Sequence, residues 1–275
     1  MSIAAPRYVA SSGERRGRGY RILAILRREF LRRAGVGTLL VVALAYLAVT
    51  LIVVINAEFA SAIGQLSVST YESPFQSPVW GLVMLIVATA VGAGSVADDI
   101  GSRAIVLYLS RPIRLLDYLS AKAGSIGSWL LVAAAGPGLV AVGILAALGV
   151  GSAATNLSAA AAFLATGVIA AVFLTGLALA LSSLTDRALY AGVAMFGIVL
   201  ALEIGVDVVS GITGNSRILY LSPVTDLTSV AQGAFQLTGP FVTDPLASGV
   251  LLTAVGVMLA IFAYLRLSQV EVVGE

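Results

Sequence analysis

The sequence predicts an all-α integral membrane protein with six transmembrane helices. Two observations carry this prediction: 59% of the 275 residues are hydrophobic and only 11% are charged, and the mean hydropathy is +1.01. Six apolar runs are near or above the roughly 20 residues that a helix needs to cross a bilayer. Because hydrocarbon offers no partner to a bare backbone amide, each run is expected to be helical. The runs cover residues 37–57, 78–97, 124–150, 158–183, 188–206 and 246–265.

The N-terminal region precedes these runs and divides into two parts. Residues 1–19 mix Arg, Gly and Ser without periodicity, so a disordered basic cytoplasmic tail is expected. We expect the first run to be a retained anchor rather than a cleaved signal peptide, because a long Arg-rich stretch precedes it and no small-residue cleavage site follows. The six-span transmembrane domain then covers residues 34–275.

Residues 20–33 form an amphipathic pattern, in which apolar side chains at helical spacing lie opposite arginines. Such a helix is expected to lie in the plane of the lipid headgroups. Arg27, Arg28, Arg32 and Arg33 would then face anionic lipid. An alternative is that this basic helix also docks a cytosolic partner.

The basic residues also indicate the orientation. If the six runs alternate in direction, 15 of the 16 Lys and Arg residues fall on one side, and Arg217 alone falls on the other. Basic residues near helix ends stay on the cytoplasmic side. We therefore expect a multi-pass protein of the cytoplasmic (plasma) membrane with both termini in the cytoplasm.

The connections outside the cytoplasm carry weaker signals. The stretch before Pro78 is predicted to be an ordinary external connection, with Tyr71 and Trp80 as interfacial aromatics. The glycosylation pattern at Asn156 is interpreted as chance, since it lies in a short loop beside the membrane. Pro137 is expected to kink or interrupt the third run.

Residues 207–245 are too polar in places for another span and too apolar for a free loop. They are expected to fold onto the outer face of the membrane. Within them, Ser222 followed by Pro223 is typical of a helix start, because Ser caps the first turn and Pro needs no backbone donor there. The sequence therefore predicts a short helix over residues 223–235.

The segment over residues 98–122, "DDIGSRAIVLYLSRPIRLLDYLSAK", concentrates charge between the second and third runs. We expect Asp98 and Asp99 to favour the positive end of a following helix over residues 101–109. Pro112 would end this helix, and a second helix would continue through Lys122 into the third run. A short charged element held between two spans could transmit a push.

This segment resembles a pattern found in the membrane subunits of ABC-2 type transporters. The pattern begins with an acidic residue, Gly, and Ser or Thr, continues with Leu-Ser-Arg-Pro, and ends with spaced Arg, Tyr and Lys residues. The resemblance covers most of the chain, including the in-plane N-terminal helix and a segment like the family's external re-entrant helices before the last span. It implies that the segment is a coupling helix seated in a groove of a separate ABC ATP-binding subunit. The residues that the resemblance assigns to this contact are Asp98, Asp99, Gly101, Ser102, Arg103, Ser110, Arg111 and Pro112.

The energy source must then lie elsewhere. A phosphate-binding loop ends in Gly-Lys followed by Ser or Thr, whereas the only lysine, Lys122, follows Ala121. ATP and Mg are therefore expected on the partner ATPase, with no cofactor on this chain. A second membrane subunit, identical or homologous, is expected to complete the translocation path of an exporter, and no nucleic acid partner is expected.

The predicted spans hold few charges, so cargo is poorly encoded. Glu203 and Asp207, one helical turn apart near the outer end of the fifth run, could line an exit path or bind a cation. The alternative is that both lie at the water boundary or pair with Arg217. An apolar path suits amphipathic cargo and suits a conformational transmitter equally well.

Two other classes of function compete with the transporter reading. The chain could be a stand-alone membrane scaffold or sensor that recruits a cytosolic protein through its basic face. It could also be an intramembrane enzyme, but it contains no His and no Cys. Their absence excludes disulfides, thiolate and imidazole metal ligands, and any Cys or His nucleophile or base.

Overall fold

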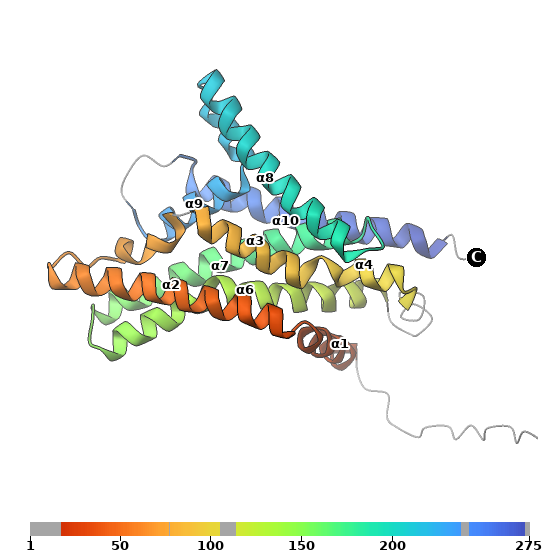
Figure 1. Cartoon of the computed structure of the whole chain (residues 1–275), viewed down its shortest axis with the longest axis horizontal. Coiled ribbons are helices and arrows are strands. Elements are labelled where there is room, and N and C mark those ends of the chain that lie inside the picture. The colour runs from red at the N-terminus through yellow and green to blue at the C-terminus, as the bar shows by residue number, and fades with distance from the viewer. Residues whose placement is uncertain (1–17, 77, 105–113, 238–241, 273–275) are drawn as a thin grey trace, which may run out of the picture.

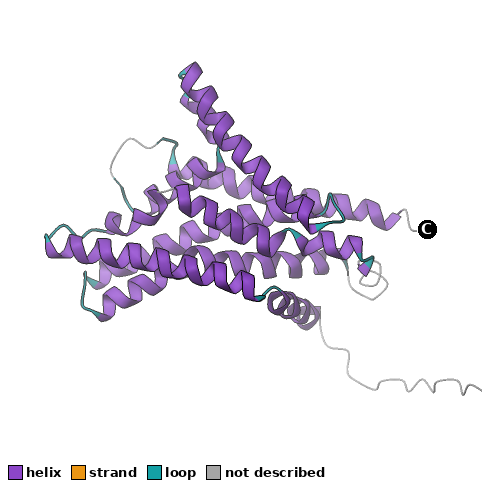
Figure 2. Cartoon of the chain, viewed as in Figure 1, coloured by secondary structure: helices purple, strands orange, loops and turns teal. Residues whose placement is uncertain are grey.

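The computed structural model describes residues 18–76, 78–104, 114–237 and 242–272. Within them the chain is helical and contains no strand (Figure 2). The long helices are α2 (Val36–Ala62), α3 (Pro78–Gly92) continued by α4 (Gly94–Gly101), α6 (Leu115–Ala147), α7 (Ala153–Ser182), α8 (Ala188–Thr213) and α10 (Pro245–Val272). The shorter elements are α1 (Arg18–Arg32), the 3-10 helices η1 (Val68–Gln76) and η2 (Ser216–Leu221), and α9 (Pro223–Ala234).

Six of these helical stretches are long and apolar enough to cross a membrane, with α3 and α4 counted as one stretch. The protein is therefore an all-helical integral membrane protein with six candidate spans, as the hydropathy pattern predicts. Several helices extend past the predicted runs; among them, α6 begins at Leu115, before its run, and α8 continues to Thr213. Both additions contain charged residues. A helix can continue past the apolar run wherever its polar side chains contact protein or water.

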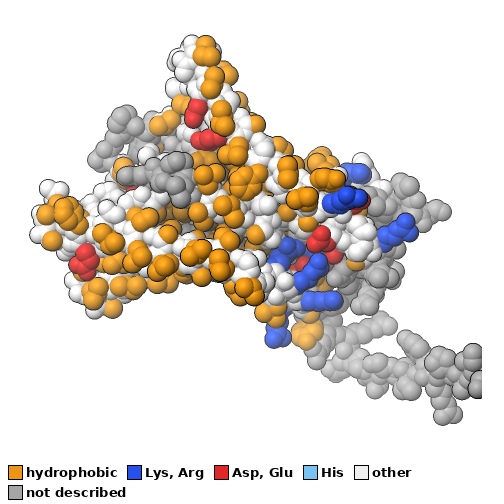
Figure 3. Space-filling view, in the orientation of Figure 1, with side chains coloured by type: hydrophobic (Ala, Val, Ile, Leu, Met, Phe, Trp, Pro, Cys, Tyr) orange, Lys and Arg blue, Asp and Glu red, His pale blue; other side chains and the backbone are white. Residues whose placement is uncertain are grey.

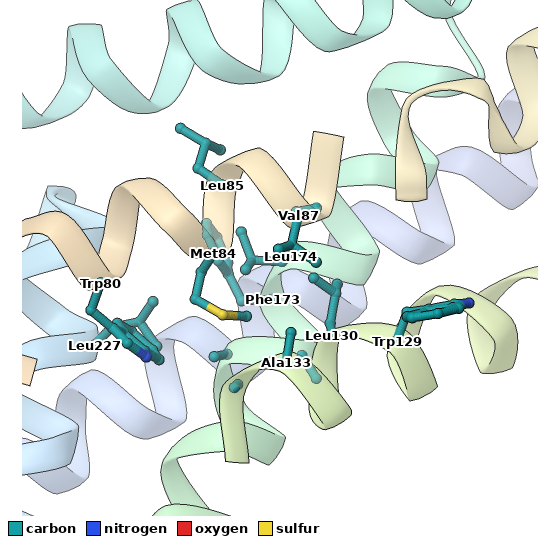
Figure 4. Close-up of a cluster of buried hydrophobic side chains, with 14 of the residues drawn as sticks. Trp80, Met84, Leu85, Val87, Trp129, Leu130, Ala133, Phe173, Leu174 and Leu227 are labelled. Carbon is teal, nitrogen blue, oxygen red and sulfur yellow. The ribbon is translucent and has the colours of Figure 1, made fainter. Parts of the chain in front are cut away.

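The centre of the bundle is formed by α3, α6 and α7. Figure 4 shows Met84 of α3, Leu130 of α6 and Leu174 of α7 gathered in one cluster of buried side chains. In these helices half to two thirds of the most apolar stretch is buried, whereas in α2, α8 and α10 it is less than a third. The apolar outer faces of those three helices suit contact with lipid.

Helix α8 diverges from the other long helices toward its C-terminal end, as Figure 1 shows. Its exposed apolar side chains run along most of its length. In contrast to α8, helices α7 and α10 approach each other closely, at Gly176 and Gly256. A Cβ atom at Gly176 would lie 2.0 Å from the backbone oxygen of Gly256, so neither position tolerates a side chain without movement.

Pro137 does not interrupt its helix, contrary to the stronger form of the prediction, since α6 runs through it. A proline inside a helix removes a backbone donor and is tolerated in a membrane when neighbouring helices supply other contacts. Here Tyr46 of α2 donates a hydrogen bond to the Val132 carbonyl at 2.8 Å, and Thr50 donates to the Pro137 carbonyl at 3.1 Å. The flanking glycines leave room for this approach and for Phe163 of α7.

The second span is broken at Ala93, between α3 and α4. A new helix start leaves backbone donors unsatisfied, which is costly away from water. The Ser182 hydroxyl at the end of α7 accepts from the backbone N–H of Val96 at 2.7 Å and of Ala97 at 3.0 Å. A serine from another helix therefore caps α4.

The segment that precedes α3 is more integrated than the predicted plain connection. In η1, Tyr71 is fully buried and its hydroxyl donates to Asn156 Oδ1 at 2.7 Å. The Asn156 amide donates to the Val150 carbonyl at 3.0 Å, so this asparagine has a structural role and is not an accessible glycosylation acceptor. Tyr71 and Trp80 are therefore core residues, and their prediction as interfacial aromatics is wrong.

The prediction of a helix after Ser222 is confirmed within one residue. Helix α9 begins at Pro223 and ends at Ala234, and the Ser222 hydroxyl accepts from the Thr225 backbone N–H at 3.2 Å. Helix α9 packs against α7 and α10. Of the region before α10, helix α9 therefore lies on the bundle, whereas Asp207, the predicted first residue of the region, still lies in α8.

Candidate functional site

Basic side chains gather at one end of the bundle, which we call the basic end (Figure 3). Helix α1, the end of α4, the start of α6 and the start of α8 meet there (Figure 1). The described ends of the chain, at α1 and α10, also lie at this end. Arg217 lies in η2, after the far end of α8.

A buried ion pair network forms the core of the basic end. Lys122 Nζ of α6 lies 3.0 Å from Glu29 Oε2 of α1 and 2.8 Å from Asp99 Oδ2 of α4. All three side chains are at most 5% exposed. Tyr118 also donates its hydroxyl to Asp99 Oδ2, at 2.7 Å. One ammonium group therefore ties three helices together in an environment where an unpaired charge would be costly.

Two arginines at the end of α1 extend this network. The Arg32 guanidinium is half exposed and lies 3.5 Å from the Asp98 carboxylate and 3.8 Å from that of Asp99. Arg33 is largely buried, lies 3.7 Å from the Glu29 carboxylate, and donates to the Val91 carbonyl. Burial lowers the pKa of the Arg33 guanidinium, and the Glu29 carboxylate opposes that change. We call Glu29, Arg32, Arg33, Asp98, Asp99 and Lys122 the ion cluster.

Helix α1 is also fixed to α6 by apolar contacts. The Phe30 ring stacks on Trp129 with the ring centres 4.7 Å apart, and the Trp129 indole donates to the Phe30 carbonyl at 3.1 Å. Leu26 packs over Gly124, where a Cβ atom would lie 2.7 Å from its side chain. The prediction that residues 20–33 are helical is confirmed. The face of α1 that carries Leu26 and Phe30, however, packs on α6 instead of facing lipid.

The four arginines predicted to face lipid separate into two pairs. Arg27 and Arg28 are exposed, while Arg32 and Arg33 point toward the acidic residues of the ion cluster. Helix α1 thus exposes Arg27 and Arg28 at its surface.

The end of α4 carries the next group of predicted site residues. Asp98 and Asp99 lie in its last turn, so their predicted role ahead of a helix start is wrong. A Cβ atom at Gly101 would lie 2.4 Å from the Asp186 carbonyl oxygen, so glycine lets α4 contact the turn between α7 and α8. Ser102 ends the helix and Arg103 has a left-handed backbone with φ of 55°. The left-handed backbone at Arg103 therefore ends α4 with a turn.

The second half of the predicted element begins at Leu115. Arg114 precedes α6, and the helix continues without a break through Asp117 and Lys122 into the third span, as the sequence predicts. The structure does not describe residues 105–113, which include Ser110, Arg111 and Pro112. The predicted helix over residues 101–109 is therefore tested only at its start, and that start is wrong because Gly101 ends α4.

A cavity of about 740 Å³ opens beside the ion cluster. Arg32, Arg33 and Asp98 line it together with Thr38, Thr89 and small or apolar residues of α3, α4 and α8. It therefore combines charged groups with an apolar wall.

Glu203 and Asp207 lie far from the basic end and share a smaller cavity of about 320 Å³ with residues of η1, η2 and α9. Glu203 is partly buried and accepts a hydrogen bond from the Ser222 hydroxyl, whereas Asp207 is exposed. Neither carboxylate forms an ion pair with Arg217, although all three residues are described. The structure thus brings the two predicted acidic residues to one cavity.

A buried acidic residue of α9 was not singled out by the sequence. The Asp226 carboxylate accepts from the Ser248 hydroxyl of α10 at 2.6 Å, and Thr243 donates to Ser229 beside it. Burial raises the pKa of Asp226, and the Ser248 and Thr243 hydroxyls oppose that change. This arrangement fixes α9 to the start of α10.

Sequence reasoning also missed Glu29 and did not assign Lys122 to a site. In the sequence, a single Glu among arginines suggests a charge in contact with water. Only the structure shows that Glu29 is buried. Across the residues that the structure describes, no group of three acidic side chains could hold a metal ion. Neither the scan of protein-family models nor the search of curated proteins finds a match to this chain.

Proposed function

We propose that this chain is the membrane subunit of an ABC-2 type transporter, an exporter driven by a separate ATP-binding subunit. In this proposal each membrane subunit contributes six spans to the plasma membrane, and the basic end faces the cytoplasm. The segment between α4 and α6 is the coupling element that the ATPase contacts. Asp98, Asp99, Gly101, Ser102 and Arg103 would contribute from the α4 side, and Ser110, Arg111 and Pro112 from the rest of the segment.

The observation that carries this proposal is the attachment of both ends of the coupling segment. Its first end is the last turn of α4, and its second end is the first turn of α6. Asp99 joins these two ends through Tyr118 in the first turn of α6 and through Lys122 about one turn later, and Lys122 also pairs with Glu29 of α1. A displacement applied between the two ends would therefore move α4, α6 and α1 together rather than bend a loose loop.

The requirement for a partner ATPase follows from the chain's own residues. It lacks a glycine-rich loop that ends in Gly-Lys and Ser or Thr. ATP and Mg would thus be held by the partner. The apolar outer faces of α2 and α8 would be available to a second membrane subunit, and Glu203 and Asp207 would line the exit side of the path between the two subunits.

One observation favours the scaffold as a second candidate. Arg27 and Arg28 project from a helix that is rigidly attached to the bundle, which suits recruitment of an acidic cytosolic protein as well as contact with anionic lipid. This function needs no ATPase and no coupling segment.

Co-purification from cells that express the chain with its genomic neighbours separates the two. The transporter proposal predicts that an ATPase co-purifies with the wild type and is lost with Arg111→Glu or Pro112→Ala. Arg266→Glu, which changes an exposed arginine at the same end of the bundle, is the matched control and should retain the ATPase. Retention by all four proteins would contradict the assigned contact, and a partner that is lost only with Arg27→Glu and Arg28→Glu would favour the scaffold.

A further inference from the structure

A buried group of polar side chains joins α9 to α10 at the end of the bundle opposite the basic end (Figure 1). It consists of Asp226 and Ser229, one turn apart in α9, and of Thr243 and Ser248, on either side of the start of α10. We call these four residues the hydroxyl cluster. All four side chains are at most 2% exposed. The proposed function does not use this cluster.

The hydrogens of the hydroxyl cluster can be counted from its geometry. The side chains form three short contacts in series, Asp226 to Ser248 at 2.6 Å, Ser248 to Thr243 at 2.9 Å and Thr243 to Ser229 at 2.7 Å. The geometry makes Thr243 the donor to Ser229 and Ser248 the donor to Thr243. Each hydroxyl group has a single hydrogen to donate. The hydrogens of Thr243 and Ser248 are therefore both used in these two contacts.

The contact between Asp226 and Ser248 needs a third hydrogen. Ser248 is placed to donate to Asp226 as well as to Thr243, but its one hydrogen cannot serve both acceptors fully. A protonated carboxyl group has an O–H donor of its own. If Asp226 is protonated and donates to Ser248, each of the three contacts contains one hydrogen. If Asp226 is ionised, it attracts the Ser248 hydrogen, and Ser248 and Thr243 then face each other as two oxygen atoms 2.9 Å apart.

The surroundings of Asp226 also disfavour a negative charge. Helix α9 packs against α7, α8, α10, η1 and η2. Helix α7 has no titratable side chain, and those of the other four at this end of the bundle are Tyr71, Glu72, Glu203, Asp207, Arg217, Tyr220 and Asp244. Arg217, the one cation in this set, is exposed, and no Lys or Arg among the described residues forms an ion pair with Asp226. Burial raises the pKa of Asp226, because the ionised form loses its hydration there.

We infer that Asp226 is a proton-binding site, which holds α9 on α10 while the proton is bound and releases α9 when the proton is lost. A buried anion without a cation is costly unless water reaches it, and α9 and α10 are the helices that supply the hydroxyl cluster around Asp226. Because the folded arrangement favours the protonated carboxyl group, it is held at low pH and weakened as the pH rises.

The position of the cluster indicates which side of the membrane supplies the proton. Ser229 is also among the residues that line the cavity of Glu203 and Asp207, so the cluster borders that cavity. In the proposed orientation this end faces the exterior, and Asp226 responds to the external pH. The inference does not depend on the ATPase, because it concerns described residues of a single chain.

Infrared spectroscopy of the purified full-length chain detects the proton directly, because the C=O stretch of a protonated carboxyl group is separate from the bands of carboxylates and amides. At neutral pH, Asp226→Asn should remove the contribution of one protonated carboxyl group. Asp207→Asn, which changes an exposed acidic residue of α8, is the matched control and should keep that contribution. In the wild type the contribution should disappear as the pH is raised.

Ser248→Ala keeps the experiment decisive even if Asp226→Asn fails to fold. It removes a donor to the ionised form of Asp226, so the band of the protonated carboxyl group should persist to a higher pH than in the wild type. Equal spectra of the wild type and Asp226→Asn at neutral pH, equal losses for Asp226→Asn and Asp207→Asn, or an unchanged titration in Ser248→Ala would each overturn the inference.

The release of α9 is tested with a single thiol, since the chain contains no cysteine. Val230 of α9 is 5% exposed, and a Cβ atom at Gly249 of α10 would lie 3.6 Å from its side chain. Val230→Cys should therefore react slowly with a water-soluble thiol reagent while α9 lies on α10. Val208→Cys, at an exposed position of α8, is the matched control that corrects for titration of the thiol itself.

The rate for Val230→Cys relative to Val208→Cys should rise about five-fold over the pH range in which the infrared band disappears, as expected for the loss of about one hydrogen bond. In the Asp226→Asn background the relative rate should stay constant across that range. A relative rate that does not change with pH, or that rises equally in the Asp226→Asn background, would show that the proton on Asp226 does not hold α9 in place.

Discussion

Removal of the Lys122 ammonium group is the sharpest perturbation of the ion cluster. In Lys122→Met, two carboxylates that are at most 5% exposed lose a cation at 2.8 and 3.0 Å. Breaking a buried ion pair on one side typically costs about 3–5 kcal/mol. Arg32 and Arg33 remain 3.7–3.8 Å from these carboxylates, so the lower end of that range, about 3 kcal/mol, is expected.

Thermal unfolding of the detergent-solubilised chain measures this loss. A destabilisation of about 3 kcal/mol corresponds to a decrease in Tm of roughly 6–12 °C for a chain of this size. The double variant Lys122→Met, Asp99→Asn should recover part of the stability, since the one buried carboxylate that remains, Glu29, keeps Arg33 at 3.7 Å.

Arg114→Gln is the matched control, because Arg114 is an exposed basic residue just before the same helix. Its Tm should stay within about 2 °C of the wild type, as expected for a surface charge. If Lys122→Met were as stable as Arg114→Gln, or if the double variant were less stable than Lys122→Met, the reasoning about the ion cluster would be refuted.

Three further predictions concern other parts of the bundle. Burial raises the pKa of Asp226, so its contribution to stability is greatest below the ordinary aspartate pKa of about 4 and is lost as the pH rises through the raised value; Asp226→Asn should therefore raise the Tm at neutral pH, and a gain that is the same at every pH would contradict this. Gly176→Ala should cost about 1–3 kcal/mol through the close approach of α7 to Gly256, whereas Gly197→Ala, which meets no atom within 4 Å, should be neutral or stabilising in the same unfolding assay. Tyr71→Phe should cost about 1–2 kcal/mol by leaving the buried Asn156 oxygen without its donor, while Tyr190→Phe, at an exposed position, should have little effect; equal values would argue against the buried hydrogen bond.

The parts of the fold that could be predicted from the sequence depend on short-range signals. The six spans follow from the length of apolar runs, and α9 follows from Ser222 and Pro223, which act within one helical turn. The continuation of α6 through Lys122 was predictable for the same reason, because nothing in "LLDYLSAK" breaks a helix.

The parts that could not be predicted depend on contacts between distant segments. Glu29 and Lys122 lie on different helices, and their approach is visible only after α1 has packed on Trp129. Asp98 and Asp99 were placed before a helix because acidic pairs favour helix starts, but they bind Arg32 and Lys122 from the end of α4 instead. The Ser182 cap of α4 has no local signature either, since donor and acceptor come from different spans.

The central claim, that an ATPase contacts the segment between α4 and α6, is tested most directly by thiol cross-linking. The chain contains no cysteine, so Ser110→Cys introduces its sole thiol and Gln65→Cys places a matched thiol after α2, at the opposite end of the bundle. The account predicts that a short bifunctional cross-linker joins Ser110→Cys to the co-expressed ATPase, that this link blocks ATP hydrolysis by the complex, and that Gln65→Cys gives no adduct. An adduct from Gln65→Cys equal to that from Ser110→Cys, or no adduct from either, would contradict it.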